Sequence, residues 1–324
     1  VDYMAGVLDP AMQMTLTPDD IIQMKEDNIN TITIYPSTHI PSYLSFFYEF
    51  EKPYLIGVIK EAKKHGLAVR VSGQSGPSSP SEDIFFERKD LISERVLEWA
   101  EISEELSVEY FSPWTEVDAM GFQRAVDWHG EILPKVRHKF SGKVFAGWTC
   151  CSSDDVFTKD FLPSEYGEAH DESDIGQTYG RTIGFVRRIK ASKDFDGVML
   201  DYQAPTPLMM KYFFNPLKTK EPDDPYRPDS LEKIVKYTSQ TAEEVGIPLY
   251  VGEFYVETVE GGFSQNAKAF DEEEQAEYIR KFLTIVMPHY DGVNHCMWNN
   301  PFSGGIKDKK AEQVIKEKYG EVTN

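Results

Sequence analysis

The chain has 324 residues, of which 40% are hydrophobic and 13% aromatic, a globular composition that can bury a sizeable core. Its 54 acidic residues against 34 basic ones give a formal net charge of -20, which argues against nucleic acid and anionic membranes as partners. No apolar run approaches the roughly 20 residues needed to cross a bilayer, and three cysteines cannot build a disulfide framework. We therefore expect a neutral partner molecule.

The first half of the chain predicts alternating strands and helices. Residues 3–8 form a short apolar run, and Thr17 followed by Pro18 and two acidic residues is typical of a helix start. Residues 30–35 are rich in β-branched side chains, which favours a strand. The same unit then recurs, with helices expected at residues 54–65, 91–106 and 122–140, and strands at residues 67–71, 108–114 and 143–148.

Two long polar segments interrupt the second half. Residues 150–175 are expected to be a long loop because they are polar and rich in acidic residues, and residues 206–227 because they contain several prolines and aromatic residues. Around them the alternation continues. Helices are expected at residues 176–190, 231–245, 272–286 and 309–318, and strands at residues 197–202, 248–256 and 292–298.

Eight strands that alternate strictly with helices predict parallel pairing and closure into a barrel. Residues 1–324 are therefore expected to form a single α/β domain, a (β/α)8 TIM barrel. An open, doubly wound sheet is the alternative. That architecture favours a glycine-rich turn after the first strand, and Asp9-Pro10-Ala11-Met12 is unlike such a turn.

Glutamates follow the fourth and seventh predicted strands. Glu116 stands in Trp-Thr-Glu, and Glu253 lies among aromatic residues near the end of residues 248–256. In a barrel the catalytic groups lie where strands end, and strands four and seven face each other across the mouth. Two opposed carboxylates fit glycoside hydrolysis, in which one donates a proton and the other attacks the anomeric carbon. A separation of roughly 5 Å indicates retention of configuration, and more than about 6.5 Å indicates inversion.

These residues resemble the clan A glycoside hydrolases, in particular the mannan- and glucan-cleaving branches such as the family 113 β-mannanases. The resemblance implies retaining hydrolysis of a neutral β-linked oligo- or polysaccharide, with Glu116 as acid/base and Glu253 as nucleophile, and it implies no metal or organic cofactor. Tyr202 would match the tyrosine that bonds the nucleophile, and Trp298 the tryptophan beneath the sugar. Thr115 stands where many members have an asparagine that holds the sugar 2-hydroxyl.

Further side chains at strand ends are expected to line the same mouth and bind substrate. Tryptophans there are candidates to stack on the apolar face of a sugar ring, although they could equally fill the core. The additional candidates are Tyr35, Trp114, Trp148, Asp201, Tyr255 and Asn299.

Other interpretations of the same carboxylates remain open. Glu253 could be a structural ion-pair partner, with Arg70 as its cation, and Asp118 could be the true site carboxylate in place of Glu116. Asp201 is expected to be a polar cleft residue rather than a third catalytic acid. His39, His129, His170 and His295 are expected to be hydrogen-bonded surface or core residues.

Two other functions compete with hydrolysis. Glycine pairs at residues 261–262 and 304–305 are where barrels often bind phosphate, which favours a phosphosugar isomerase or lyase. The acidic balance of the chain argues against that activity. A non-catalytic carbohydrate-binding barrel would need the same aromatic mouth without a working pair of carboxylates.

Overall fold

The structure is a computed structural model in which eight strands alternate with helices along the chain. It describes residues 2–6, 16–38, 45–73, 85, 87–116, 118, 121–148, 182–203, 230–256, 272–296, 298 and 305–323. The strands are β1 (Asp2–Gly6), β2 (Thr31–Ile34), β3 (Ala68–Ser72), β4 (Tyr110–Ser112), β5 (Lys143–Trp148), β6 (Gly197–Gln203), β7 (Leu249–Tyr255) and β8 (Gly292–Cys296). The helices are α1 (Pro18–Glu26), α2 (Ser45–Lys64), α4 (Lys89–Glu105), α5 (Phe122–Lys139), α6 (Thr182–Ala191), α8 (Leu231–Val245), α9 (Glu272–Val286) and α10 (Lys310–Thr323).

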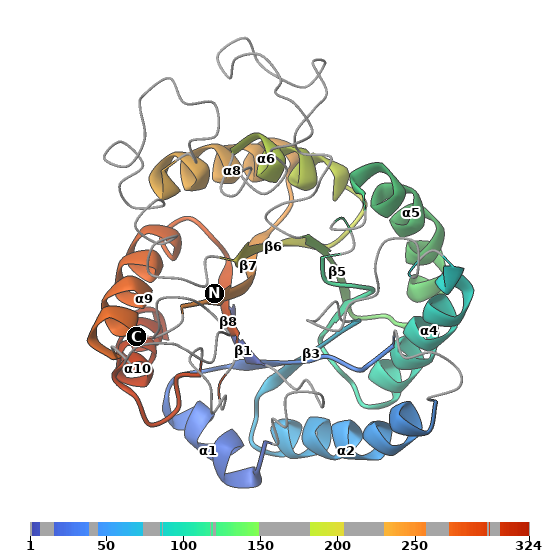
Figure 1. The fold of residues 1–324 in the computed structure, drawn as a ribbon, viewed down its shortest axis with the longest axis horizontal. Helices are drawn as coiled ribbons and strands as arrows, with labels where there is room; N and C mark the ends of the chain where they lie inside the picture. Colours follow the sequence, from blue (N-terminus) through green and yellow to red (C-terminus); the bar gives the residue numbers. More distant parts are fainter. Residues whose placement is uncertain are drawn as a thin grey trace, which may run out of the picture.

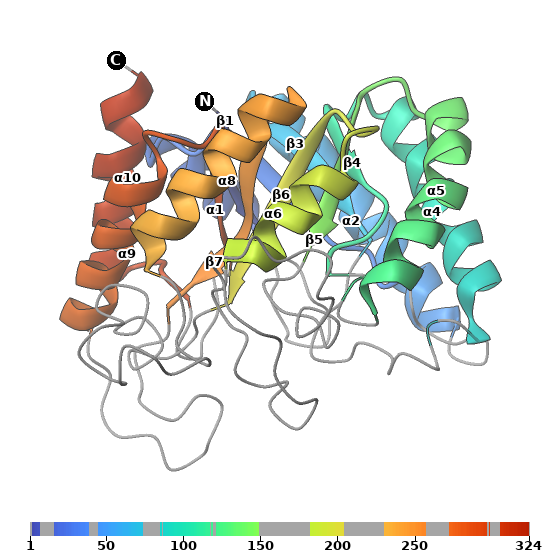
Figure 2. The same ribbon diagram turned by 90° about the horizontal axis from the view of Figure 1, so that it is seen from above.

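The eight strands form one closed barrel in sequence order, and all of the neighbouring pairs are parallel (Figure 1). Closure comes from β1, which pairs with β8 from Asp2 opposite Gly292 to Gly6 opposite Cys296. The helices surround this barrel, as the view from the side also shows (Figure 2). The predicted (β/α)8 architecture is confirmed, and pairing of the first strand with the last excludes the open sheet.

Among the described residues, the largest difference from the predicted element bounds is in helix α2, which contains a proline. The helix expected at residues 54–65 begins at Ser45 and continues through Pro53. Contacts of the earlier turns hold it, because the Tyr48 hydroxyl donates to Glu98 at 2.7 Å and Glu51 accepts from the backbone of Ser37 at 3.0 Å. The long loops expected at residues 150–175 and 206–227 lie outside the described residues.

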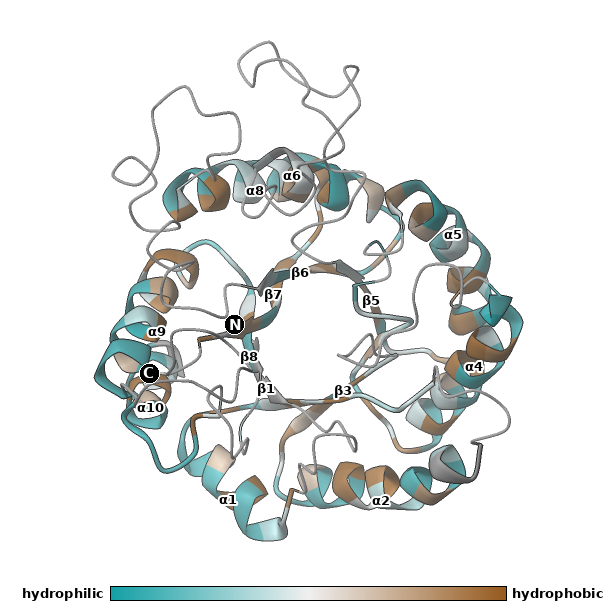
Figure 3. Cartoon of the chain, viewed as in Figure 1, coloured by the Kyte–Doolittle hydropathy of each residue, from teal (hydrophilic) through white to brown (hydrophobic). Residues whose placement is uncertain are grey.

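Two apolar layers lie on either side of the strands. Inside the barrel, near the start of the strands, Tyr110, Phe145, Met199 and Tyr250 pack on one another, and we call them the barrel floor. The larger core lies between the strands and the helices, which carry apolar and polar residues on different faces (Figure 3). Space for a ligand is therefore expected at the opposite end, where the strands finish.

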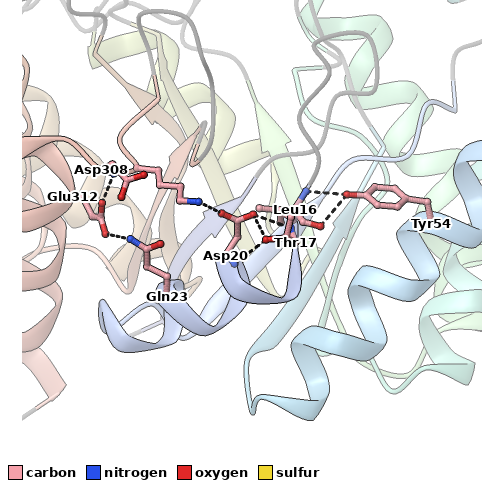
Figure 4. Close-up of polar contacts among 8 residues, drawn as sticks. Leu16, Thr17, Asp20, Gln23, Tyr54, Asp308 and Glu312 are labelled. Atoms are coloured by element: carbon pink, nitrogen blue, oxygen red, sulfur yellow. Dashed lines mark hydrogen bonds and ion pairs between the residues drawn. The ribbon is translucent and has the colours of Figure 1, made fainter.

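Helix α1 joins the first and last parts of the barrel (Figure 4). It begins with a capping box in which Thr17 accepts from the Asp20 backbone and Asp20 accepts from the Thr17 backbone. Asp20 also binds Lys307 at 2.6 Å, and the Tyr54 hydroxyl on α2 accepts from the backbone of Leu16 at 2.9 Å. These contacts tie the start of α1 to α2 and to the segment that precedes α10. Within the described part of the chain, no helix is long and apolar enough to cross a membrane.

Candidate active site

A bulge in β7 determines which side chains of this strand enter the barrel. Leu200 pairs with Val251 and Asp201 pairs with Glu253, so Gly252 is an extra residue on β7. The pairing with β8 skips one residue over the same stretch. Strict alternation from Tyr250 in the barrel floor would point Glu253 outward. The extra residue reverses this, so Glu253 faces the barrel interior and Phe254 stacks on Phe282 of α9 at 3.7 Å.

Three carboxylates meet at the end of the strands. One oxygen each from Glu116, Asp201 and Glu253 lie within 4.8 Å of one another. Asp201 is fully buried, whereas Glu116 is partly exposed. Among the described residues this is the set whose geometry could hold a cation, but acidic groups often gather without one. Like charges at this range cannot all ionise freely, so the cluster favours retention of a proton.

Asn294 of β8 and Gly252 build the wall behind this cluster. The side-chain amide of Asn294 donates to the Gly252 carbonyl at 2.5 Å, and Asn294 is fully buried. A β-carbon at residue 252 would overlap the Oδ1 atom of Asp201 and approach Met199 Cβ to 2.9 Å. The missing side chain at residue 252 therefore leaves the space that the Asp201 carboxylate occupies.

Glu116 follows β4 with an unusual backbone. Its φ angle of 59° lies in the left-handed region, which non-glycine residues seldom adopt. The preceding residue is held on both backbone and side chain, because Thr115 donates its N–H to the Gly73 carbonyl at 2.8 Å and its Oγ1 lies 2.7 Å from Ser72 Oγ. Thr115 is 2% exposed. Its hydroxyl is thus engaged within the protein, which disfavours the expected contact with a sugar 2-hydroxyl.

Asp118 does not replace Glu116 in the cluster. Its Oδ2 atom accepts from Arg188 Nε of α6 at 2.6 Å, and both side chains are fully buried. The other alternative paired Glu253 with Arg70. Arg70 instead donates to the Tyr35 hydroxyl at 2.9 Å, and within the described residues it forms no ion pair. The geometry therefore disfavours Asp118 as the site carboxylate and Arg70 as the cation of Glu253.

Tyr202 lies on the outer side of β6, away from the carboxylates. Its ring stacks on Phe185 of α6 at 4.9 Å and meets Phe282 of α9 edge-on. Its hydroxyl lies 2.5 Å from the Tyr290 hydroxyl, which in turn lies 2.7 Å from Thr238 Oγ1. Burial raises the pKa of Tyr290 to about 12, so this hydroxyl stays protonated. Tyr202 therefore points away from Glu253, and its neighbour Asp201 is the β6 residue whose carboxylate lies near Glu253.

The tryptophans at the strand ends pack into the outer core. Trp114 meets Phe85 and Trp128 edge-on. Trp148 donates to Ser192 Oγ at 2.7 Å and packs on Phe122. All five tryptophans are at most 1% exposed, including Trp298. The stacking surface expected of Trp114 and Trp148 is therefore absent, because alternation along β5 and the turn after β4 direct them toward the helices.

The remaining candidates divide between the interior and the undescribed segments. Tyr35 is fully buried and follows β2, with its hydroxyl on Arg70. The side chain of Tyr255, all of Asn299, and most of the two glycine pairs lie outside the described residues. His129 and His295 are buried in the outer core, and burial lowers the pKa of each to about 3, so both are neutral.

Two contributors to this site have only weak sequence signals. Arg188 falls on the apolar face of α6, three residues after the buried Phe185 and one before the buried Ile189. A cation on an apolar helix face suggests a buried acidic partner, but not which one. Gly252 carries even less signal, because a glycine inside a strand is only a hint of a bulge.

Comparisons with known proteins agree on the fold. No protein-family model and no curated protein matches the sequence. Among solved structures, a GH113 β-1,4-mannanase has a TM-score of 0.62 at 15% identity, with 98% of each chain covered. The GH113 β-mannanase AaManA from Alicyclobacillus acidocaldarius, in complex with ManMIm, has a TM-score of 0.61 at 13% identity, covering 99% of this chain and 96% of its own.

Thermotoga maritima Cel5A, in complex with a mannotriose substrate, has a TM-score of 0.59 at 12% identity. The match covers 98% of this chain and 97% of that one. At such low identity the likeness concerns the fold. The chain therefore has a (β/α)8 barrel fold similar to those of the solved mannanases and of Cel5A.

Proposed function

We propose that this protein is a retaining β-glycoside hydrolase that cleaves a neutral β-linked glycan of the β-mannan or β-glucan type. The observation that carries the proposal is the approach of Glu116, Asp201 and Glu253 to within 4.8 Å at the end of the strands. Retaining enzymes place their two carboxyl groups about 5 Å apart, and inverting enzymes place them more than about 6.5 Å apart. The names of the structural neighbours, mannanases and a Cel5A with bound mannotriose, support the class of substrate.

The mechanism takes two displacements. Glu253 attacks the anomeric carbon while Glu116 donates its proton to the oxygen of the leaving sugar, which forms a glycosyl ester on Glu253. In the second step Glu116, now ionised, takes a proton from water as that water attacks the same carbon. Glu253 is released as a carboxylate, Glu116 is protonated again, and the configuration is retained.

Asp201 suits this division of roles. Its buried carboxylate adds negative charge beside Glu116, and a nearby negative charge raises the pKa of a carboxyl group. Glu116 can therefore remain an acid near neutral pH, as the first step requires.

The test is hydrolysis of manno-, gluco- and xylo-oligosaccharides, followed by NMR of the first-formed anomer. We expect a β product from at least one substrate. A 2-deoxy-2-fluoro glycoside should add its sugar mass to the peptide that contains Glu253. Glu253→Gln should abolish both the hydrolysis of oligosaccharides and this labelling.

Glu98→Gln is the matched control, because Glu98 binds Tyr48 and Lys52 on the outside of the barrel. It should leave turnover unchanged. An α product would contradict the retaining mechanism. Oligosaccharide binding without cleavage, unaffected by Glu253→Gln, would instead support a non-catalytic carbohydrate-binding barrel.

A further inference from the structure

We propose that the buried ion pair between Asp118 and Arg188 positions the acid/base Glu116, by tying the segment after β4 to helix α6. This inference rests on the proposed function and adds two residues to its machinery. Neither of them touches the reacting atoms. Both are therefore positioning residues, which act through the backbone of Glu116.

The pair joins two distant parts of the chain. Arg188 Nε donates to Asp118 Oδ2 at 2.6 Å across 70 residues of sequence, and both side chains are fully buried. Burying two charges removes them from water, and hydrophobic residues in their place are often equally stable. The pair is thus poorly explained by stability alone. Its directional contact does fix where Asp118 must lie.

Glu116 needs such a constraint because its backbone is strained. With a φ of 59°, it adopts a conformation that persists only where the surroundings enforce it. One anchor precedes it, at Thr115, through the bonds to Gly73 and Ser72. The second anchor follows it two residues later, at Asp118. A strained residue between two buried anchors has little freedom to turn its carboxyl away.

The close fit of β5 strengthens the first anchor. A β-carbon at Gly147 would come within 2.8 Å of the Trp114 carbonyl oxygen and 3.1 Å of Thr115 Cα. The chain before Glu116 therefore lies directly against the backbone of β5. Movement of Thr115 toward that strand is blocked.

Arg188 is itself held in place from two sides. Its carbonyl accepts from Ser192 Oγ at 2.8 Å, and Ser192 accepts from Trp148 Nε1 of β5 at 2.7 Å. Its neighbour Arg187 lies 3.7 Å from the centre of the Phe122 ring, at the start of α5. Helix α6 therefore contacts both β5 and the start of α5, and these contacts hold Arg188 in place for Asp118.

The experiment compares Asp118→Asn, Arg188→Met and the double variant Asp118→Leu/Arg188→Met. Two β-glycosides are assayed: an oligosaccharide, and a 2,4-dinitrophenyl glycoside whose leaving group departs without a proton. If Glu116 is displaced, kcat/KM for the oligosaccharide should fall by roughly 10- to 100-fold, and for the dinitrophenyl glycoside much less. A merely structural pair would lower both equally.

The double variant separates positioning from stability. It removes both charges of this pair together, so its Tm should lie closer to that of the unaltered protein than the Tm of either single variant. The loss of kcat/KM for the oligosaccharide should persist in the double variant. An unchanged kcat/KM in a stable double variant, or equal losses on both substrates, would overturn the proposal.

Lys307→Met is the matched control, because Lys307 binds the buried Asp20 at the same 2.6 Å but ties α1 to the segment after β8. Lys307→Met should lower the Tm, but it should not affect kcat/KM for the oligosaccharide more than kcat/KM for the dinitrophenyl glycoside. If the unaltered protein cleaves neither glycoside, the proposed function fails. A crystal structure of the double variant still decides the inference, because Glu116 with unchanged φ and an unchanged place beside Glu253 would contradict it.

Discussion

The carboxylate of Asp201 on β6 lies directly over Gly252 on β7, where any side chain would overlap it. Gly252 is also the extra residue of the β7 bulge that turns Glu253 into the barrel. Gly252 therefore affects the carboxylates on both β6 and β7. It makes room for the carboxylate on β6 and sets the direction of the carboxylate on β7.

Replacing Gly252 by alanine is expected to reduce kcat strongly. The added carbon would displace Asp201 and push against Met199 Cβ at 2.9 Å, which shifts the bulge and moves Glu253. Displacements of about 1 Å in a catalytic group can lower the rate roughly 100-fold. Steady-state kinetics on the best oligosaccharide would measure the loss.

Gly57→Ala on α2 is the matched control for that substitution. A β-carbon there would meet nothing within 4 Å, and alanine inside a helix is favoured over glycine by about 0.5–1 kcal/mol. We expect unchanged kinetics and equal or higher stability. Normal turnover by Gly252→Ala would show that the site tolerates movement of Asp201.

Asp201→Asn should shift the alkaline limb of the kcat/KM profile to lower pH, by on the order of one unit. The variant keeps the shape of the side chain but removes its negative charge, which lowers the pKa of Glu116. Glu116 and Glu253 are the charged groups of the cluster that lie beside Asp201.

Asp196→Asn provides the comparison, because Asp196 precedes β6 at the other end of the barrel and binds Arg137 and the backbone of Val144. Asp196→Asn should leave the alkaline limb of the kcat/KM profile at the same pH. A limb that stays fixed in Asp201→Asn would mean that Asp201 does not affect the proton on Glu116.

Asp27→Asn at the end of α1 is expected to stabilise the protein at neutral pH. Burial, together with the nearby Glu312, raises the pKa of Asp27 to about 6. The folded state then binds more protons than the unfolded state between pH 4 and 6, so ionised Asp27 costs stability above that window. Calorimetry at pH 7 should show a Tm higher by about 1–4 °C, with the gain shrinking below pH 6.

Asp20→Asn at the other end of the same helix should have the opposite effect. Burial of Asp20 opposes its ionisation, but hydrogen bonds from Lys307 and Thr17 outweigh burial and lower its pKa. Its contribution to stability is present at neutral pH and is lost in acid. A lower Tm for Asp27→Asn at pH 7 would contradict this assignment of charges.

Acid should destabilise the protein through its buried histidines. Burial lowers the pKa of His129 to about 3, and burial with the charge of Lys309 does the same for His295. The unfolded chain takes up these protons near pH 6.5, so stability falls as the pH drops from about 6.5 toward 3. Thermal unfolding of His129→Phe should depend less on pH across this range. Parallel curves for variant and unaltered protein would exclude His129 as a cause.

The sequence by itself determined the alternation of strands and helices, and with it the barrel. Turn residues, helix caps and β-branched runs act locally, so they can be recognised one segment at a time. The same local pattern placed Glu116 and Glu253 at strand ends. In a barrel, strand ends share one mouth, so proximity of the two glutamates followed from topology.

Only the tertiary structure decided which way the side chains point. Alternation from Tyr250 would send Glu253 outward, and the bulge at Gly252 reverses this. Tyr202, expected at the mouth, lies in the outer core, and Asp201 takes the inward place. Direction depends on register with neighbouring strands, and partners such as Arg188 and Asp118 are 70 residues apart. Such relationships arise from packing between distant segments, which no local pattern encodes.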